Sequence, residues 1–203
     1  IIDLKDPLKG ALGRLAEQDI IDIINFIDKK KLTSSTVGDL PNNEALISHN
    51  VNEISATAVD FIKIGVYDNF YINTLCKIKS SKRLIAVFFA DVFLPTESEM
   101  MRLKESGFSG VMVDTSNKKL GNLFAHTSSS EISNFLELAK KIDLLTGVAG
   151  SINETHIPEI VKLNPNYMGF RGALCEDKLV RNSGISQHSV NNIINLVNDL
   201  KQN

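Results

Sequence analysis

Two lysines stand in apolar segments of the sequence, where burial of an ammonium group is costly. Lys63 lies in the apolar run 60–66, and Lys5 ends the apolar run 1–5. Each lysine therefore points into a polar site or forms a structural ion pair, which for Lys63 would involve a carboxylate such as Asp91 or Asp114. A lysine held in a desolvated site supplies an amine that acts as a nucleophile or a base. The two residues therefore predict amine chemistry.

Acidic side chains end several of the other apolar runs. Asp114 closes the run 110–115, and Lys118 follows in the next segment. A carboxylate beside ammonium groups can orient one of them and exchange protons with another. Asp39 and Asp91 end two further runs and are predicted to support the site. The alternative for each carboxylate is that it caps a turn or lies in an ordinary loop.

Two glycine-containing segments late in the sequence are suited to binding phosphate. Gly150 and Ser151 end the run 144–151, and Arg171 and Gly172 lie in the final apolar run. Glycine lets a ligand approach backbone N–H groups, and arginine offers a forked pair of donors to phosphate oxygens. Either segment alone is a weak signal. Both fall in the last two strand–helix units, where barrel enzymes often bind phosphate.

Composition and charge exclude several other classes. The 22 Lys and Arg against 24 Asp and Glu give a net charge of −2, which offers no electrostatic argument for binding nucleic acid or an anionic membrane. Cys76 and Cys175 are far apart and lack CxxC spacing, so we expect neither a disulfide nor a zinc site and favour a reducing cytoplasm. The four histidines lack metal-ligand spacing, and no apolar run reaches the length of a membrane span.

Short β-branched runs alternate with amphipathic stretches, a pattern typical of a parallel sheet with crossover helices. Strands are predicted at residues 1–5, 34–39, 60–67, 84–91, 110–115, 144–151 and 167–174. Helices are predicted at residues 14–30, 43–58, 72–79, 96–106, 131–142, 154–163 and 189–201. Ser130 is the predicted N-cap of the fifth helix, and Pro95 is predicted to open the fourth. No linker divides the chain, so residues 1–203 are predicted to form one domain.

Repeated strand–helix units of this kind most often close into an eight-stranded (β/α)₈ barrel, the TIM barrel. Seven units are predicted here, so the first βα unit of the barrel is expected to be missing from this sequence. A natural seven-stranded sheet is one alternative. An open doubly wound sheet is less favoured, because no GxGxxG turn follows any predicted strand. In a barrel the carboxyl ends of the strands meet at one mouth, which would bring together the polar residues named above.

The chain resembles the (5-formylfuran-3-yl)methyl phosphate synthases, also called 4-(hydroxymethyl)-2-furancarboxaldehyde-phosphate synthases. The matching motifs extend over nearly the whole sequence and keep the order of the family. They lie at residues 1–7, 10–13, 35–39, 60–65, 113–115 with 118, 123–124, 149–151, 171–173, 175–176 and 181–182. Many of them are at predicted strand ends, which makes the resemblance specific.

The resemblance implies that two molecules of glyceraldehyde 3-phosphate are condensed into (5-formylfuran-3-yl)methyl phosphate, in the biosynthesis of methanofuran-type cofactors. Lys5 matches the Schiff-base lysine of the family and Lys63 its proton acceptor, while Asp114 and Lys118 match further residues required for activity. It implies a cytoplasmic carbon–oxygen lyase that uses no metal or other cofactor. Triose phosphate is the expected small-molecule partner, and a homo-oligomer is compatible with this reading.

Two other functions remain as alternatives. Another Schiff-base barrel of the class I aldolase type would keep the strand lysines but make no furan. A non-catalytic phosphometabolite-binding protein would bind phosphate and form no adduct that borohydride can trap. The presence of Lys5, Lys63, Asp114 and Lys118 together argues against the second alternative.

Overall fold

The computed structural model describes residues 1–203 except 179, 181, 182 and 203, so the motif at 181–182 lies outside the described residues. The strands are β1 (Ile2–Leu4), β2 (Thr33–Thr36), β3 (Phe61–Val66), β4 (Arg83–Phe89), β5 (Phe108–Asp114), β6 (Leu145–Val148) and β7 (Tyr167–Met168). The α-helices are α1 (Glu17–Ile27), α2 (Glu44–Ser55), α3 (Asn69–Leu75), α4 (Glu97–Glu105), α5 (Ser129–Lys141), α6 (Ile157–Leu163) and α7 (Gln187–Gln202). No described helix is long and apolar enough to span a membrane.

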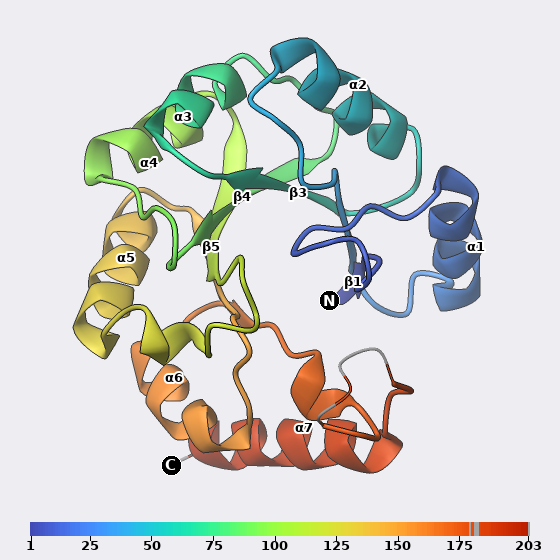
Figure 1. Ribbon diagram of the computed structural model, residues 1–203, viewed down its shortest axis with the longest axis vertical. Helices are drawn as coiled ribbons and strands as arrows, with labels where there is room; N and C mark the ends of the chain where they lie inside the picture. Colours follow the sequence, from blue (N-terminus) through green and yellow to red (C-terminus); the bar gives the residue numbers. More distant parts are fainter. Residues whose placement is uncertain (179, 181–182, 203) are drawn as a thin grey trace.

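The seven strands form one sheet in which every neighbouring pair is parallel and the order follows the chain, from β1 to β7. Figure 1 shows this sheet curled on itself inside an outer ring formed by helices α1 to α7. Within the described part of the chain, β1 and β7 are the two edges. The prediction of a parallel α/β sheet is therefore confirmed in a seven-stranded, curled form. Closure by an eighth strand is not seen among the described residues and stays a prediction.

Every predicted element has bounds that differ from the observed ones, and the seventh strand and the third helix are two examples. The seventh strand was expected over 167–174, but β7 ends at Met168 and residues Gly172–Leu174 form a 3₁₀ turn. The third helix was expected over 72–79, whereas α3 begins at Asn69 because the carboxylate of Asp68 accepts the Tyr71 N–H (3.0 Å) and caps the helix earlier.

The predicted starts of two other helices were also wrong. Ser128, rather than Ser130, is the N-cap of α5, and it forms a reciprocal capping box with Glu131. Thr96 forms the same kind of box with Glu99 at the start of α4, so Pro95 precedes the cap instead of opening the helix. In both cases the capping box gives hydrogen-bond partners to two backbone N–H groups at the start of the helix. The predicted single cap or proline would not pair both groups.

The two faces of the curled sheet have different neighbours, as the alternation of side chains along a strand requires. In β3, Ile62, Ile64 and Val66 face outward into the main core beneath the helices. Phe61 faces inward, where a smaller apolar cluster fills the interior, and Lys63 shares this inward side because it lies two residues further along. The inner cluster consists of Leu12, Phe61, Ile85, Val87, Phe89, Met112 and Ala149.

The segment that joins β1 to α1 folds back over the interior. Leu12 in this segment is 2% exposed and belongs to the inner cluster. It packs directly over Gly65 of β3, where an added Cβ would lie 2.8 Å from Leu12 Cδ1. The Thr36 hydroxyl donates to the Gly13 carbonyl (3.1 Å), which links the segment to β2. The Asp6 N–H donates to the same carbonyl (2.9 Å), which links the two ends of the segment.

Candidate active site

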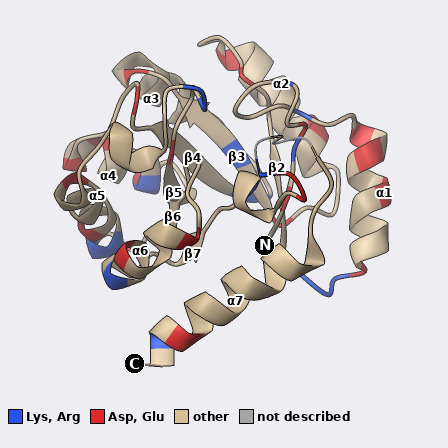
Figure 2. Cartoon of the chain, turned by 60° about the horizontal axis from the view of Figure 1, so that its bottom comes forward, with Lys and Arg blue, Asp and Glu red and all other residues tan. Residues whose placement is uncertain are grey.

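Lys63 is a buried charge of the sheet interior, and its partner is Asp3 of β1. The Lys63 Nζ lies 3.1 Å from Asp3 Oδ1, and the two side chains are 8% and 30% exposed. Figure 2 shows the basic segment of β3, and further acidic and basic segments on the outer helices. The structural partner considered from the sequence, Asp91 or Asp114, was therefore wrong. The pair forms inside the curl, between two strands that β2 separates.

Asp3 is held as a carboxylate by several neighbours. Burial alone would raise its pKa, but the ammonium groups of Lys63 and Lys5 and the Ser34 hydroxyl together lower the pKa of Asp3 below its ordinary value. The Ser34 hydroxyl donates to Asp3 Oδ1 at 2.6 Å. Sequence reasoning missed Asp3, although its position two residues before Lys5 on an extended strand puts both side chains on one face.

Lys5 directly follows β1 and belongs to the same charged group. Its Nζ donates to the carbonyl of Ala11 at 3.1 Å, and its charge also lowers the pKa of Asp3. Lys5, Asp3 and Lys63 thus form one cluster of two amines and one carboxylate. Such a cluster can present one amine as a nucleophile while the carboxylate exchanges protons with the other.

Tyr167 of β7 closes this cluster from the other edge of the sheet. Lys63 Nζ lies 6.0 Å from the centre of the Tyr167 ring. Burial, followed by the charge of Asp3, raises the pKa of Tyr167, so its hydroxyl stays neutral. That hydroxyl is buried and has no hydrogen-bond partner among the described residues, although buried polar groups rarely lack one. In the sequence, the only signal for Tyr167 as a site residue was its position at the start of the last predicted strand.

Asp114 and Lys118 form a second, separate pair. Asp114 ends β5 on the inward-facing side, two residues after Met112 of the inner cluster, and Lys118 Nζ donates to its Oδ1. The Thr115 N–H also donates to Asp114 Oδ1 (2.7 Å), and Lys118 contacts the Thr115 hydroxyl (3.1 Å). Of the four residues predicted to be catalytic, Lys63 pairs with Asp3 and Lys118 pairs with Asp114, while Lys5 lies beside the first pair.

The two supporting carboxylates hold loops at the end of the sheet. Asp91 accepts the Ser116 N–H (2.7 Å), the Ser116 hydroxyl (2.8 Å) and the Asn117 N–H (2.9 Å), and thereby shapes the segment that leads to Lys118. Burial would raise the pKa of Asp91, but these hydrogen bonds lower it. Asp39 accepts the Tyr67 hydroxyl at 2.6 Å and the Leu12 N–H at 3.4 Å.

The predicted phosphate residues lie on two segments. Gly150 and Ser151 follow β6 with positive φ angles of 113° and 51°, and an added Cβ on Gly150 would meet Leu123 Cβ and Thr115 Cγ2 at 3.1 Å. Arg171 and Gly172 follow β7, and Arg171 Nη2 donates to the Ser183 carbonyl (3.3 Å). Arg171 Nη1 is buried without a hydrogen-bond partner among the described residues, as expected of a donor available to an anion.

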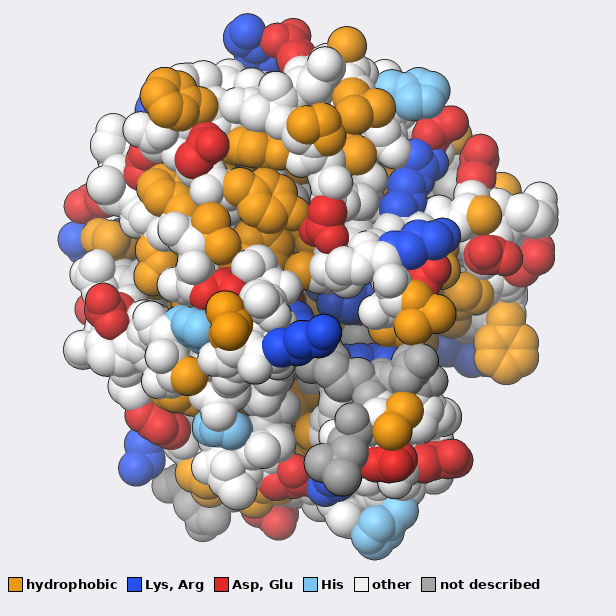
Figure 3. Space-filling view, viewed as in Figure 1, with side chains coloured by type: hydrophobic (Ala, Val, Ile, Leu, Met, Phe, Trp, Pro, Cys, Tyr) orange, Lys and Arg blue, Asp and Glu red, His pale blue; other side chains and the backbone are white. Residues whose placement is uncertain are grey.

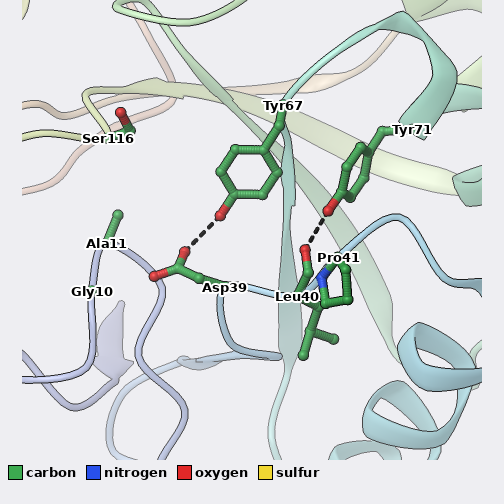
Figure 4. A pocket seen from close by; sticks show the side chains of 8 residues that line it. All are labelled: Gly10, Ala11, Asp39, Leu40, Pro41, Tyr67, Tyr71 and Ser116. Carbon is green, nitrogen blue, oxygen red and sulfur yellow. Dashed lines mark hydrogen bonds between the residues drawn. The ribbon is translucent and has the colours of Figure 1, made fainter.

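A hollow of about 450 Å³ opens beside the supporting carboxylate Asp39. Figure 4 shows the Tyr67 hydroxyl directed at Asp39 and the Tyr71 hydroxyl directed at the Leu40 carbonyl. On the face seen in Figure 3, Lys and Arg side chains gather near the centre. The lining of the hollow consists of Gly10, Ala11, Asp39, Leu40, Pro41, Tyr67, Tyr71 and Ser116.

The curled parallel sheet, with lysine–carboxylate pairs on its inner face, makes this chain an α/β protein with a fold of the barrel type. The chain belongs to the 4-HFC-P synthase family, whose model matches residues 1–194. A relative from Methylorubrum extorquens, provisionally named a (5-formylfuran-3-yl)methyl phosphate synthase, is 34% identical over 177 residues, which cover 86% of this chain and 73% of that protein. A relative of that name from Methanococcus aeolicus is 28% identical over 190 residues, which cover 86% and 81%. The family resemblance is confirmed.

Solved structures with a similar fold share little sequence with this chain. Phosphoribosyl anthranilate isomerase from Thermus thermophilus superposes with a TM-score of 0.62 at 12% identity and covers 98% of this chain and 86% of its own. Deoxyribose phosphate aldolase from Aeropyrum pernix gives a TM-score of 0.57 at 12% identity, with 83% of each chain covered. At such identity the likeness supports the fold alone.

Asp3→Asn is expected to lower the free energy of unfolding by about 2 kcal/mol at pH 7, because it removes the charged partner of a buried ammonium group. The pKa of Asp3 is lowered in the folded state, so its contribution is complete above the ordinary value of 3.8 and is lost as the pH falls through the lower folded value. The difference between wild type and variant should therefore shrink on acidification. Urea unfolding at pH 7 and at pH 3 measures it.

The matched control for this prediction is Asp22→Asn. Asp22 is an exposed carboxylate on α1 that accepts a hydrogen bond from Gln18 (2.8 Å), so its replacement should change stability little. A deficit of Asp3→Asn that persists unchanged into acid would show that the ion pair does not stabilise the fold.

Proposed function

We propose that this protein condenses two molecules of glyceraldehyde 3-phosphate into (5-formylfuran-3-yl)methyl phosphate through an imine on Lys5. The observation that carries the proposal is the cluster of Lys5, Asp3 and Lys63 inside the sheet. The family and the names of the relatives support this product. The reaction releases one phosphate and two waters, which makes the protein a carbon–oxygen lyase in the biosynthesis of a methanofuran-type cofactor.

The first half of the reaction joins carbon to carbon. The Lys5 amine attacks the carbonyl of one triose phosphate and expels water, and the resulting iminium withdraws electrons from the neighbouring C–H bond. Lys63, as a neutral amine, takes that proton, and the carboxylate of Asp3, 3.1 Å away, stabilises the ammonium group that results. The enamine carbon then attacks the aldehyde of a second triose, and the new alkoxide takes up a proton.

The second half forms the ring. Water hydrolyses the iminium and frees the Lys5 amine. A hydroxyl of the joined chain then closes onto a carbonyl carbon, and elimination of one phosphate and two waters leaves the aromatic furan. Asp114 and Lys118, which already share a hydrogen bond, are suited to move protons in these eliminations. Arg171, through its free Nη1, and the backbone at Gly150, Ser151 and Gly172 would hold the phosphate that is retained.

Incubation with glyceraldehyde 3-phosphate is expected to give a new ultraviolet band of a furan aldehyde together with inorganic phosphate. The measurement follows absorbance and phosphate release in the same sample. A borohydride-trapped adduct without the band would instead indicate an aldolase of the Schiff-base type. The absence of both the band and the adduct would indicate a phosphometabolite-binding protein and would contradict the proposed synthase.

We also propose that residues 1–203 form one catalytic domain built as seven units of a (β/α)₈ barrel. Asp3 of β1 and Tyr167 of β7 approach Lys63 from both edges of the sheet, so the curl already brings the edges around a common interior. The thiols of Cys76 and Cys175 support a cytoplasmic location.

A further inference from the structure

The hollow at the end of the sheet has an unusual chemical character for a site expected to handle phosphorylated sugars. Among the described residues, its lining carries one carboxylate, Asp39, and two phenols, Tyr67 and Tyr71, and contains no Lys or Arg. A carboxylate repels a phosphate dianion and accepts hydrogen bonds from hydroxyl groups. The hollow therefore suits the carbonyl-and-hydroxyl end of a ligand and disfavours its phosphate end.

Tyr67 is fixed in the wall of this hollow by three neighbours. Its ring stacks on Phe89 with 5.1 Å between centroids and meets the edge of Tyr71 at 5.3 Å, and its hydroxyl donates to Asp39 Oδ1 at 2.6 Å. Burial, followed by the hydrogen bond and charge of Asp39, raises the pKa of Tyr67, so the phenol remains neutral. Since its proton is already committed to Asp39, the oxygen presents lone pairs that accept from a ligand hydroxyl.

Asp39 in turn can accept further hydrogen bonds. From the described residues, its Oδ2 receives only the long hydrogen bond of the Leu12 N–H (3.4 Å). Gly10 packs so closely against it that an added Cβ would lie 1.9 Å from Oδ2, and its φ of 85° also favours glycine. The carboxylate is thus held against the backbone of the β1–α1 segment with one face toward the hollow (Figure 4).

The hollow lies next to both lysine–carboxylate pairs. Ala11 lines it, and the carbonyl of Ala11 accepts the hydrogen bond from Lys5 Nζ (3.1 Å). Ser116 also lines it and comes two residues after Asp114. A molecule in the hollow is therefore bordered by the segment that contacts the imine-forming amine and by the segment that leads to Lys118.

We propose that this hollow is the subsite of the second triose, that it takes the carbonyl-and-hydroxyl end of that molecule, and that Tyr67 and Asp39 determine its selection. The inference rests on the proposed synthase function. The phosphate of the second triose then points out of the hollow, away from Asp39. Tyr67 acts by accepting the hydroxyl next to the aldehyde, which orients the aldehyde carbon toward the enamine.

Tyr67→Phe tests the subsite, because it removes one hydroxyl and keeps the stacked ring. At subsaturating glyceraldehyde 3-phosphate, furan formation should fall about tenfold, the effect of one lost hydrogen bond that orients a substrate. Borohydride trapping of the first triose on Lys5 should keep its wild-type half-saturation concentration. The matched control is Tyr71→Phe, whose hydroxyl is bonded to the Leu40 carbonyl, and its loss should be much smaller.

The possible outcomes distinguish a failure of the proposed subsite from a failure of the proposed synthase function. Furan formation by Tyr67→Phe at the wild-type rate, or an equal loss of trapping and condensation, would overturn the subsite and leave the synthase standing. A wild-type protein that makes no furan would overturn the synthase and the subsite together. Asp39→Asn provides a second test of the subsite, since it keeps the shape of the side chain. It should likewise weaken condensation without weakening the trapping of the first triose.

Discussion

Lys5→Arg is expected to abolish both the trapped adduct and furan formation. Arginine keeps the positive charge and can still donate to the Ala11 carbonyl, which Lys5 contacts at 3.1 Å. Its guanidinium stays protonated in proteins and offers no free amine to a carbonyl carbon. The loss therefore reports on the imine itself rather than on local charge. Intact-protein mass spectrometry after incubation with glyceraldehyde 3-phosphate and borohydride measures the adduct.

Lys9→Arg is the matched control for this experiment. Lys9 lies in the same segment, but its side chain is 64% exposed and pairs with Asp6 at the surface (3.2 Å). The variant should therefore form the adduct and the furan as the wild type does. An adduct on Lys5→Arg would assign the imine to another lysine, and peptide mapping would identify it.

Lys63→Met is expected to lower the rate of furan formation by about 10²–10⁴-fold while the trapped adduct on Lys5 persists. Methionine fills a similar volume beside the inner cluster but cannot take a proton from the iminium. The reaction then stops after the first covalent step. Comparing adduct mass with the furan band in one sample measures both steps, and thermal unfolding checks that the fold is kept.

Lys77→Met serves as the control for Lys63→Met. Lys77 pairs with Glu44 at 2.9 Å, but both side chains are more than half exposed, so the variant should form adduct and furan normally. Loss of the adduct in Lys63→Met would contradict the separate roles of the two lysines and would place Lys63 in imine formation.

The sequence was sufficient to predict the parallel sheet, because buried parallel strands read as continuous apolar runs, as 84–89 does. It also identified Lys63 and Asp114, since a charged residue inside such a run needs a reason to be there. The partner of Lys63 could not be predicted. In the β1–β2–β3 ladder Asp3 pairs with Ser34, and Ser34 pairs with Phe61 rather than Lys63. Only the stagger and curl of the sheet bring the two charges together.

The hollow was even less accessible to sequence reasoning. Asp39 was expected to support the site, but its partner Tyr67 lies 28 residues further along. Their contact depends on how the β1–α1 segment folds back, with Leu12 on Gly65 and Gly10 against the carboxylate. Loop conformation of this kind is set by tertiary packing and leaves no periodic pattern in the sequence.

The Asp3–Lys63 ion pair also favours the correct register of β1 along β2 during folding. β1 contributes three residues to the ladder, so few backbone hydrogen bonds oppose a slip along β2. A slip by one residue would turn Asp3 toward the helices and Leu4 toward the interior. The buried ammonium of Lys63 would then lose its counter-charge, a penalty larger than that of an ordinary misaligned pair. The same two charges that we place in the candidate site thereby favour the observed register of β1 on β2.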